Sequence, residues 1–186
     1  MGGFILTFKI LLYSIGDELF SDDYSINLVD DIVYEVDCSM INLDKRHDID
    51  ITGYASDEES DGGTEEIVDL IHHFHFFPQL MDKKAYLSNL KRYLKVLKRI
   101  LNETNPERIP IFESKVYAQV QKILNNYNNY DLYLGISDDI DGMLALLSYR
   151  EDGTPYFTFF KDGLQEFEAV SFFLLFFVRS SDLYVF

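Results

Sequence analysis

The sequence predicts an α+β protein, built as a mainly antiparallel β domain with one inserted, basic helical hairpin and one long acidic loop. Three observations support this. Short apolar runs separated by turn residues occupy both ends of the chain. A segment with three- and four-residue apolar spacing lies between them, at residues 83–127. An acid- and glycine-rich stretch, residues 42–66, has little apolar surface to bury.

Length and composition indicate one globular domain, residues 1–166, followed by an apolar tail at 167–186. The 186 residues are 47% hydrophobic and 26% charged, which is typical of a folded domain. A net charge of −16 disfavours a dedicated nucleic-acid binder. A single cysteine excludes an intrachain disulfide and is compatible with the cytoplasm. The apolar run at 170–178 is too short to span a bilayer, so we expect no transmembrane segment.

The N-terminal third contains two strand-like runs, residues 26–29 and 32–36, with a turn at Asp30 and Asp31 between them. Cys38 follows the second run. A reactive thiol needs a basic neighbour, and the sequence shows none. The pattern therefore favours a strand-end cysteine over a reactive one.

An acidic loop at residues 16–22 precedes these strands and holds two apolar residues, Leu19 and Phe20. In one interpretation it is a plain turn whose apolar residues enter the core. In the other, Asp17 and Glu18 form an acidic contact site for a partner. Composition alone favours the turn.

The acidic stretch at 42–66 predicts a long mobile loop, because little apolar burial offsets the entropy lost on ordering it. Some of its residues match the first, third, fifth and sixth positions of a calcium-binding EF loop, but the twelfth position is Val68 instead of a carboxylate. Weak calcium binding and a merely solvated loop both remain open. The candidate calcium ligands are Asp57, Glu58, Glu59 and Asp61.

Residues 67–77 alternate in a way that predicts a strand, with His73 and His75 on one face and His72 on the other. A zinc site needs three or four ligands. This spacing offers two at most, and no cysteine lies nearby. We therefore expect a structural or surface role for the histidines and no zinc site.

Residues 83–127 predict two amphipathic helices that fold back as an antiparallel hairpin. Asp82 is placed to cap the first helix, which should end near Asn105–Pro106, and a short link through Pro110 leads to the second. The first apolar stripe is Tyr86, Leu90, Tyr93, Leu94, Leu97, Ile100 and Leu101; the second is Phe112, Val116, Val120, Ile123, Leu124 and Tyr127.

The hairpin is strongly basic in an acidic chain. It holds ten of the sixteen lysines and arginines and only three acids, for a net charge of +7. A solvated outer face would explain any single lysine, whereas the cluster predicts a binding surface for an acidic partner. The candidate binding residues are Lys91, Arg92, Lys95, Lys98 and Arg99.

The chain returns to strands at residues 131–135, 143–150 and 156–160. Asp141–Gly142 and Asp152–Gly153 lie between these runs, and aspartate–glycine pairs in such places are hairpin signals.

The order of these motifs resembles the translationally controlled tumour protein (TCTP, or histamine-releasing factor) family over about residues 8–166. The matching segments are 17–22 (DELFSD), 52–56 (TGYAS), 68–71 (VDLI), 83–86 (KKAY), 105–108 (NPER), 141–143 (DGM), 149–156 (YREDGTPY) and 160–164 (FKDGL). Each motif is short, but the order and spacing are specific. The apolar tail at 167–186 has no counterpart in the family.

The resemblance implies a β-tent core with a projecting helical hairpin, in a non-enzymatic cytosolic protein of growth control and cell survival. It implies binding of calcium and of tubulin or microtubules, usually at the helical region. It also implies contact with a Rheb-type small GTPase at the acids matching Asp17 and Glu18. Translation elongation factors and Bcl-family proteins are further implied partners. Ile136 stands where the family has a second acid of the GTPase surface, and Tyr54 where it has asparagine.

An enzyme is the alternative of a different class. The chain shows no nucleophile elbow, P-loop or metal-ligand spacing, which argues against it. Two further alternatives are a guanine-nucleotide exchange accessory for a Rheb-type GTPase and a weak calcium buffer.

Overall fold

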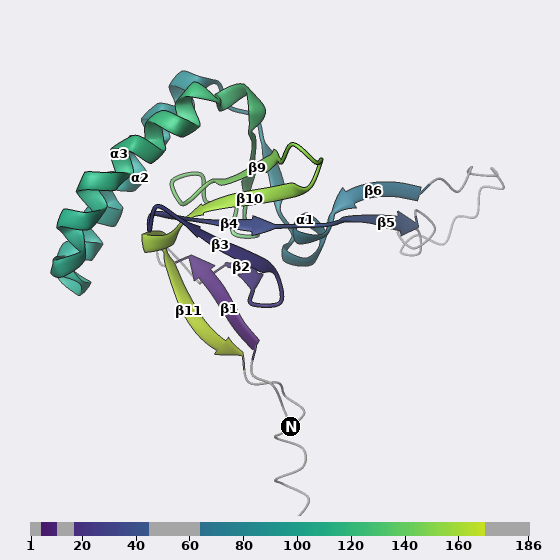
Figure 1. Ribbon diagram of the computed structural model, residues 1–186, viewed down its shortest axis with the longest axis horizontal. Helices are drawn as coiled ribbons and strands as arrows, with labels where there is room; N and C mark the ends of the chain where they lie inside the picture. Colours follow the sequence, from purple (N-terminus) through teal and green to yellow (C-terminus); the bar gives the residue numbers. More distant parts are fainter. Residues whose placement is uncertain (1–4, 11–16, 45–63, 170–186) are drawn as a thin grey trace, which may run out of the picture.

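The computed structural model describes residues 5–10, 17–44 and 64–169, and it confirms the α+β architecture. Antiparallel strands form the body of the molecule, and a long helical hairpin lies along one side of it (Figure 1). The core is one contiguous cluster that draws side chains from the largest sheet, the strand that follows the acidic loop, and the inner face of the hairpin. In the described ranges, no helix is both long enough and apolar enough to cross a lipid bilayer.

The largest sheet has six strands in the order β3-β4-β10-β9-β8-β7, and every pairing is antiparallel. Its strands are β3 (Ser25–Val29), β4 (Val33–Asp37), β7 (Phe77–Gln79), β8 (Asp131–Leu134), β9 (Ala145–Tyr149) and β10 (Pro155–Phe160). The turn predicted between β3 and β4 is confirmed. Asp30 and Asp31 there have φ angles of 52° and 59°, a left-handed conformation that aspartate tolerates better than most residues.

Two smaller sheets complete the β structure. One is β11-β1-β2, made of β1 (Ile5–Ile10), β2 (Glu18–Ser21) and β11 (Leu164–Ala169); the other pairs β5 (Met40–Asp44) with β6 (Thr64–Val68). β11 pairs with β1 up to Ala169, three residues beyond the boundary predicted at 166. The ends of the predicted loop 42–66 were wrongly assigned, because Asn42 pairs with Glu66 and Asp44 with Thr64 in this ladder.

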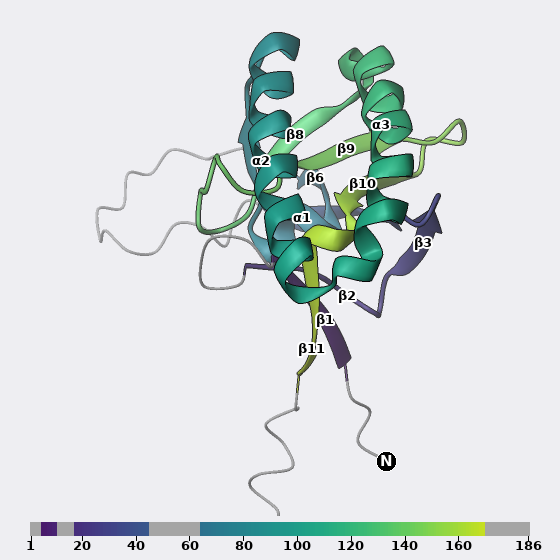
Figure 2. The same cartoon turned by 90° about the vertical axis from the view of Figure 1, so that its left-hand side faces the viewer.

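The helical hairpin consists of α2 (Lys83–Thr104) and α3 (Ile109–Asn125), which run side by side over the sheet (Figure 2). The Asp82 side chain caps α2 as predicted, accepting a hydrogen bond from the Ala85 N–H at 2.7 Å. A 3-10 turn, Pro106–Arg108, joins the helices. The prediction that Pro110 belongs to the link was wrong. Pro110 lies in the first turn of α3, where its missing N–H costs no helical hydrogen bond.

The strand predicted at 67–77 was also wrong, because a short helix, α1 (Asp69–Phe74), occupies most of it. The Asp69 carboxylate accepts a hydrogen bond from the Leu70 N–H at 2.7 Å, which favours the first turn. His75 ends the helix in a left-handed conformation, with φ of 54°. Leu70 and Phe74 lie one helical turn apart, and Leu70 is fully buried.

One polar network fastens the hairpin to the sheet. The Arg108 guanidinium, only 10% exposed, donates from Nε to Asp162 Oδ1 at 2.7 Å and from Nη2 to Asp162 Oδ2 at 3.0 Å. It also bonds the Asp31 carboxylate, which in turn accepts from Lys161. Arg108 therefore ties the turn of the hairpin to the β3–β4 turn and to the end of β10.

Candidate functional site

The five predicted partner-binding cations all lie exposed on α2. Lys91, Lys95, Lys98 and Arg99 follow one another at spacings of four, three and one residues, so a single face of the helix presents them. The opposite face holds Tyr86, Leu90, Tyr93, Leu97 and Leu101, which are all buried. Burial of this apolar stripe fixes the rotation of α2 and therefore turns the cations to solvent.

Two of these cations already have acidic neighbours. Arg92 Nη2 lies 2.9 Å from Asp141 Oδ1, and Lys98 pairs with Glu113 across the hairpin. Both pairs are at least half exposed, so each contributes little to stability and can exchange for another acid. Among the described residues, Lys91, Lys95 and Arg99 make no ion pair. We call the helix face formed by Lys91, Lys95, Lys98 and Arg99 the basic face. Three of its four cations thus have no acidic partner among the described residues.

The structure separates the two acids of the predicted GTPase contact. Asp17 is 5% exposed, and its Oδ2 accepts hydrogen bonds from the Ser137 N–H at 3.1 Å and the Ser137 hydroxyl at 2.6 Å. Glu18, the first residue of β2, is exposed. A Cβ on Gly135 would lie 2.5 Å from Asp17 Oδ2, so only glycine fits there without displacing this carboxylate. Asp17 is therefore placed to hold the β8–β9 loop, whereas the adjacent Glu18 is exposed.

The same loop, residues 135–144, contacts both candidate surfaces. At one end, Asp17 holds Ser137. At the other, the Asn89 side-chain amide of α2 donates to the Ile140 carbonyl, and Arg92 pairs with Asp141. Ile136, which stands in place of the second acid of the family's GTPase surface, is 60% exposed on this loop. The loop that Asp17 fastens thus presents an exposed apolar side chain at this position.

The predicted calcium ligands Asp57, Glu58, Glu59 and Asp61 lie outside the described residues, so weak calcium binding stays a prediction. The three histidines at 72, 73 and 75 are exposed at and after α1. Within the described part of the chain, no three His, Cys, Asp or Glu side chains converge as metal binding requires.

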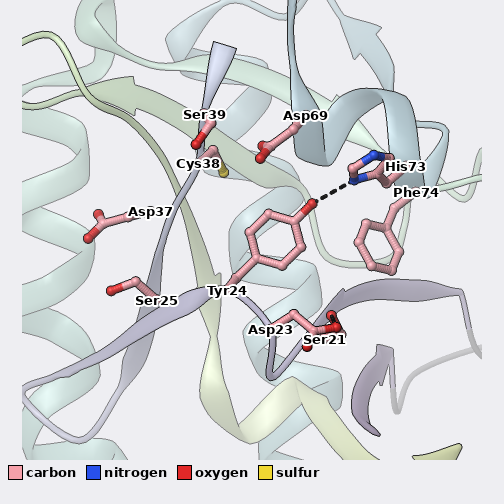
Figure 3. A pocket seen from close by; sticks show the side chains of 10 residues that line it. All are labelled: Ser21, Asp23, Tyr24, Ser25, Asp37, Cys38, Ser39, Asp69, His73 and Phe74. Carbon is pink, nitrogen blue, oxygen red and sulfur yellow. Dashed lines mark hydrogen bonds between the residues drawn. The ribbon is translucent and has the colours of Figure 1, made fainter. Parts of the chain in front are cut away.

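A pocket of about 650 Å³ was not predicted. It lies between the β2–β3 turn, the end of β4 and helix α1 (Figure 3). Tyr24 and His73 meet in it, with the phenol oxygen 2.9 Å from the imidazole Nδ1. The sequence analysis missed this pair because it predicted a strand at 67–77, whereas His73 lies on helix α1. The four-residue spacing of Leu70 and Phe74 was the signal for a helix there.

Comparison with known proteins agrees with the fold and with the motifs. The family model described as translationally controlled tumour protein matches residues 10–165. A TCTP homologue from Schizosaccharomyces pombe is 48% identical over 154 residues, covering 80% of this chain and 92% of that protein. One from Saccharomyces cerevisiae is 39% identical over 155 residues, covering 81% and 92%.

The fold also matches solved structures of TCTP proteins. The S. pombe protein p23fyp superposes with a TM-score of 0.76 at 46% identity, over 87% of this chain and 98% of that one. TCTP from Caenorhabditis elegans superposes with a TM-score of 0.67 over 89% and 100%; at 20% identity it supports the fold alone. The resemblance seen in the sequence motifs is confirmed, and the chain belongs to the translationally controlled tumour protein family.

Proposed function

We propose that this protein is a non-enzymatic, cytoplasmic regulatory protein that binds acidic partners, tubulin and microtubules first among them, through the basic face of α2. The observation that carries the proposal is the exposed row of Lys91, Lys95 and Arg99, uncompensated among the described residues. Positive charge grouped on one helix of an acidic chain attracts an acidic surface and orients it toward that helix.

A matched pair of single substitutions tests this proposal. Lys95→Glu and Lys115→Glu each replace one exposed hairpin lysine and change the net charge by the same amount. Only Lys95 belongs to the basic face of α2, so Lys95→Glu should weaken co-sedimentation with microtubules several-fold, on the order of 1 kcal/mol. Lys115→Glu should leave it nearly unchanged. Equal effects of the two substitutions would point to net charge alone and contradict a defined site.

The second candidate function is contact with a Rheb-type small GTPase, as partner or nucleotide-exchange accessory. The observation that favours it is the division of roles between neighbouring acids. Asp17 is buried and fastens the β8–β9 loop, while Glu18 remains exposed beside it. Such a carboxylate on a strand, with its surroundings fixed by hydrogen bonds, suits a specific contact to a basic side chain.

Stopped-flow release of a fluorescent nucleotide from the GTPase tests the exchange role. The wild type should accelerate release, Glu18→Ala should abolish most of the acceleration, and Asp131→Ala, at an exposed carboxylate on β8, should retain it. Release that the wild type does not accelerate would remove the exchange role. If the protein contacts the GTPase without promoting exchange, a direct binding measurement should show that Glu18→Ala weakens the complex.

Calcium, translation elongation factors and Bcl-family proteins remain further proposed ligands on the strength of the family resemblance. For calcium we expect weak binding by Asp57, Glu58, Glu59 and Asp61, because the EF-type pattern lacks its carboxylate at the twelfth position.

A further inference from the structure

We propose that the pocket of Figure 3 binds an organic cation, namely an alkylammonium or guanidinium group. At about 650 Å³, it has the size of a small-molecule site. Its walls come from three separate parts of the chain: the β2–β3 turn, the end of β4 with the residues after it, and α1. The proposal does not depend on the hairpin or on Glu18, and neither contributes to the pocket.

Aromatic faces line one side of the pocket. The rings of Tyr24 and Phe74 are half-buried, with centroids 6.2 Å apart and planes inclined at 57°. An aromatic face attracts a cation through its quadrupole, and partial burial strengthens the attraction by excluding water. The two rings therefore offer a surface that a protonated amine or guanidinium prefers to a neutral polar group.

Carboxylates face the same space. Asp37 is already neutralised, because Arg150 Nε donates to its Oδ1 at 2.8 Å. From the described residues, Asp23 accepts a side-chain hydrogen bond from the neutral Ser21 hydroxyl alone, at 3.3 Å, and Asp69 from the Leu70 N–H alone. In the described ranges, neither Asp23 nor Asp69 has an ion pair. The pocket thus keeps two negative charges that its own wall does not compensate.

The remaining polar groups add hydrogen-bonding capacity without further negative charge. Burial, followed by the charge of Asp69, raises the pKa of the Tyr24 phenol, so it stays protonated and can donate to the His73 Nδ1. The Cys38 thiol at the back is likewise kept protonated, because burial raises its pKa. Since no three ligands converge within the described residues to hold a metal ion, the spaced carboxylates suit a cation with several N–H donors.

Titration with Nα-acetyl-argininamide (argininamide for short) and its uncharged analogue Nα-acetyl-citrullinamide (citrullinamide) tests the proposal, followed by NMR. Acetylation removes the α-ammonium group, so the two compounds differ only in the charged guanidinium. Argininamide should bind at least about fivefold more tightly, as expected for a charge-dependent contact, and should shift the resonances of Tyr24 and Phe74. Asp23→Asn and Asp69→Asn should each weaken its binding about threefold or more. The matched control is Asp30→Asn, which removes the same charge outside the pocket, in a left-handed conformation that asparagine accepts.

Two further arms identify the source of the cation. An arginine-centred tripeptide that binds at least about tenfold more tightly than argininamide would assign the pocket to a partner's side chain, because the added contacts would then contribute. Equal or weaker peptide binding, with spermidine also bound, would assign it to a free polyamine-like cation. Equal affinity for argininamide and citrullinamide would overturn the proposal without any variant, as would undiminished binding by the Asp23→Asn/Asp69→Asn double variant.

Discussion

Cys38 shows how one residue's surroundings decide its chemistry. The thiol is 6% exposed, and its Sγ lies 3.4 Å from the Val36 carbonyl, to which it can donate. Burial, followed by the negative charge of Asp69, raises its pKa above the ordinary value. Since the thiolate is the nucleophile, the sequence-based expectation of an unreactive cysteine agrees with this geometry.

A thiol-reaction assay checks this, because Cys38 is the only cysteine in the chain. A raised pKa keeps the thiolate scarce through pH 8, and although Cys38 lines the pocket of Figure 3, only 6% of it is exposed there. Reaction with an aromatic disulfide reagent should therefore be at least about 100-fold slower in the native protein than in urea, limited by opening of the fold. Reaction at the same rate in both states would show that Cys38 is accessible and activated.

Asp17 is a second residue whose role depends on a distant partner. The sequence presents it as one of two adjacent acids, yet its hydrogen bonds to Ser137 span 120 positions. Burial and those bonds give it a positioning role, whereas its neighbour Glu18 stays exposed. The local sequence identified Asp17 and Glu18 as a candidate site, but it could not predict that Asp17 is buried and Glu18 exposed.

At the scale of elements, the hairpin depends on Arg108 for its attachment to the sheet. Arg108→Met should lower the free energy of unfolding by about 3–5 kcal/mol, because Asp162, with a side chain 7% exposed, would lose its cation while remaining buried. Arg99→Met is the control, since Arg99 is exposed and should cost less than about 0.5 kcal/mol. Urea unfolding followed by circular dichroism measures both, and equal losses would contradict the anchoring role.

The same network predicts a pH dependence. Hydrogen bonds from Lys161, then from Arg108, lower the pKa of Asp31 below its ordinary value of 3.8. A carboxyl with a lowered folded pKa stabilises the fold fully above its unfolded pKa, and that contribution disappears as pH falls through the folded value. Wild type should therefore lose stability below about pH 4. Arg108→Met should show a shallower dependence there; an unchanged one would contradict the assignment.

Elements with a strong local period could be predicted, and those defined by distant partners could not. The apolar stripe of α2 and the cap at Asp82 are local, and both were found where expected. Helix α1 spans only six residues, too few for its period to outweigh the alternation of the histidines. The pairing of β1 with β11 joins the two ends of the described chain. Nothing in the local sequence of either strand predicts which other strand it pairs with.

For the whole molecule, the charge distribution is the main finding that bears on function. The basic face lies on α2, while the pocket that Asp23 and Asp69 line lies at α1, on another part of the molecule (Figures 1 and 3). Composition predicted the basic face, because its residues are close in sequence. It did not predict the pocket, because Tyr24, Cys38 and His73 come together only on folding.

The central claim is that the basic face of α2 binds an acidic partner, and microtubule co-sedimentation across a salt series tests it most directly. The test variant carries Lys91→Glu, Arg92→Glu, Lys95→Glu and Lys98→Glu. Within the described part of the chain, the ion pairs that it loses are both exposed and each worth about 1 kcal/mol or less, so it should keep its circular dichroism spectrum. We predict that wild type pellets with microtubules at low salt, is released as salt rises, and that the variant fails to pellet. Undiminished pelleting of the folded variant would contradict the account.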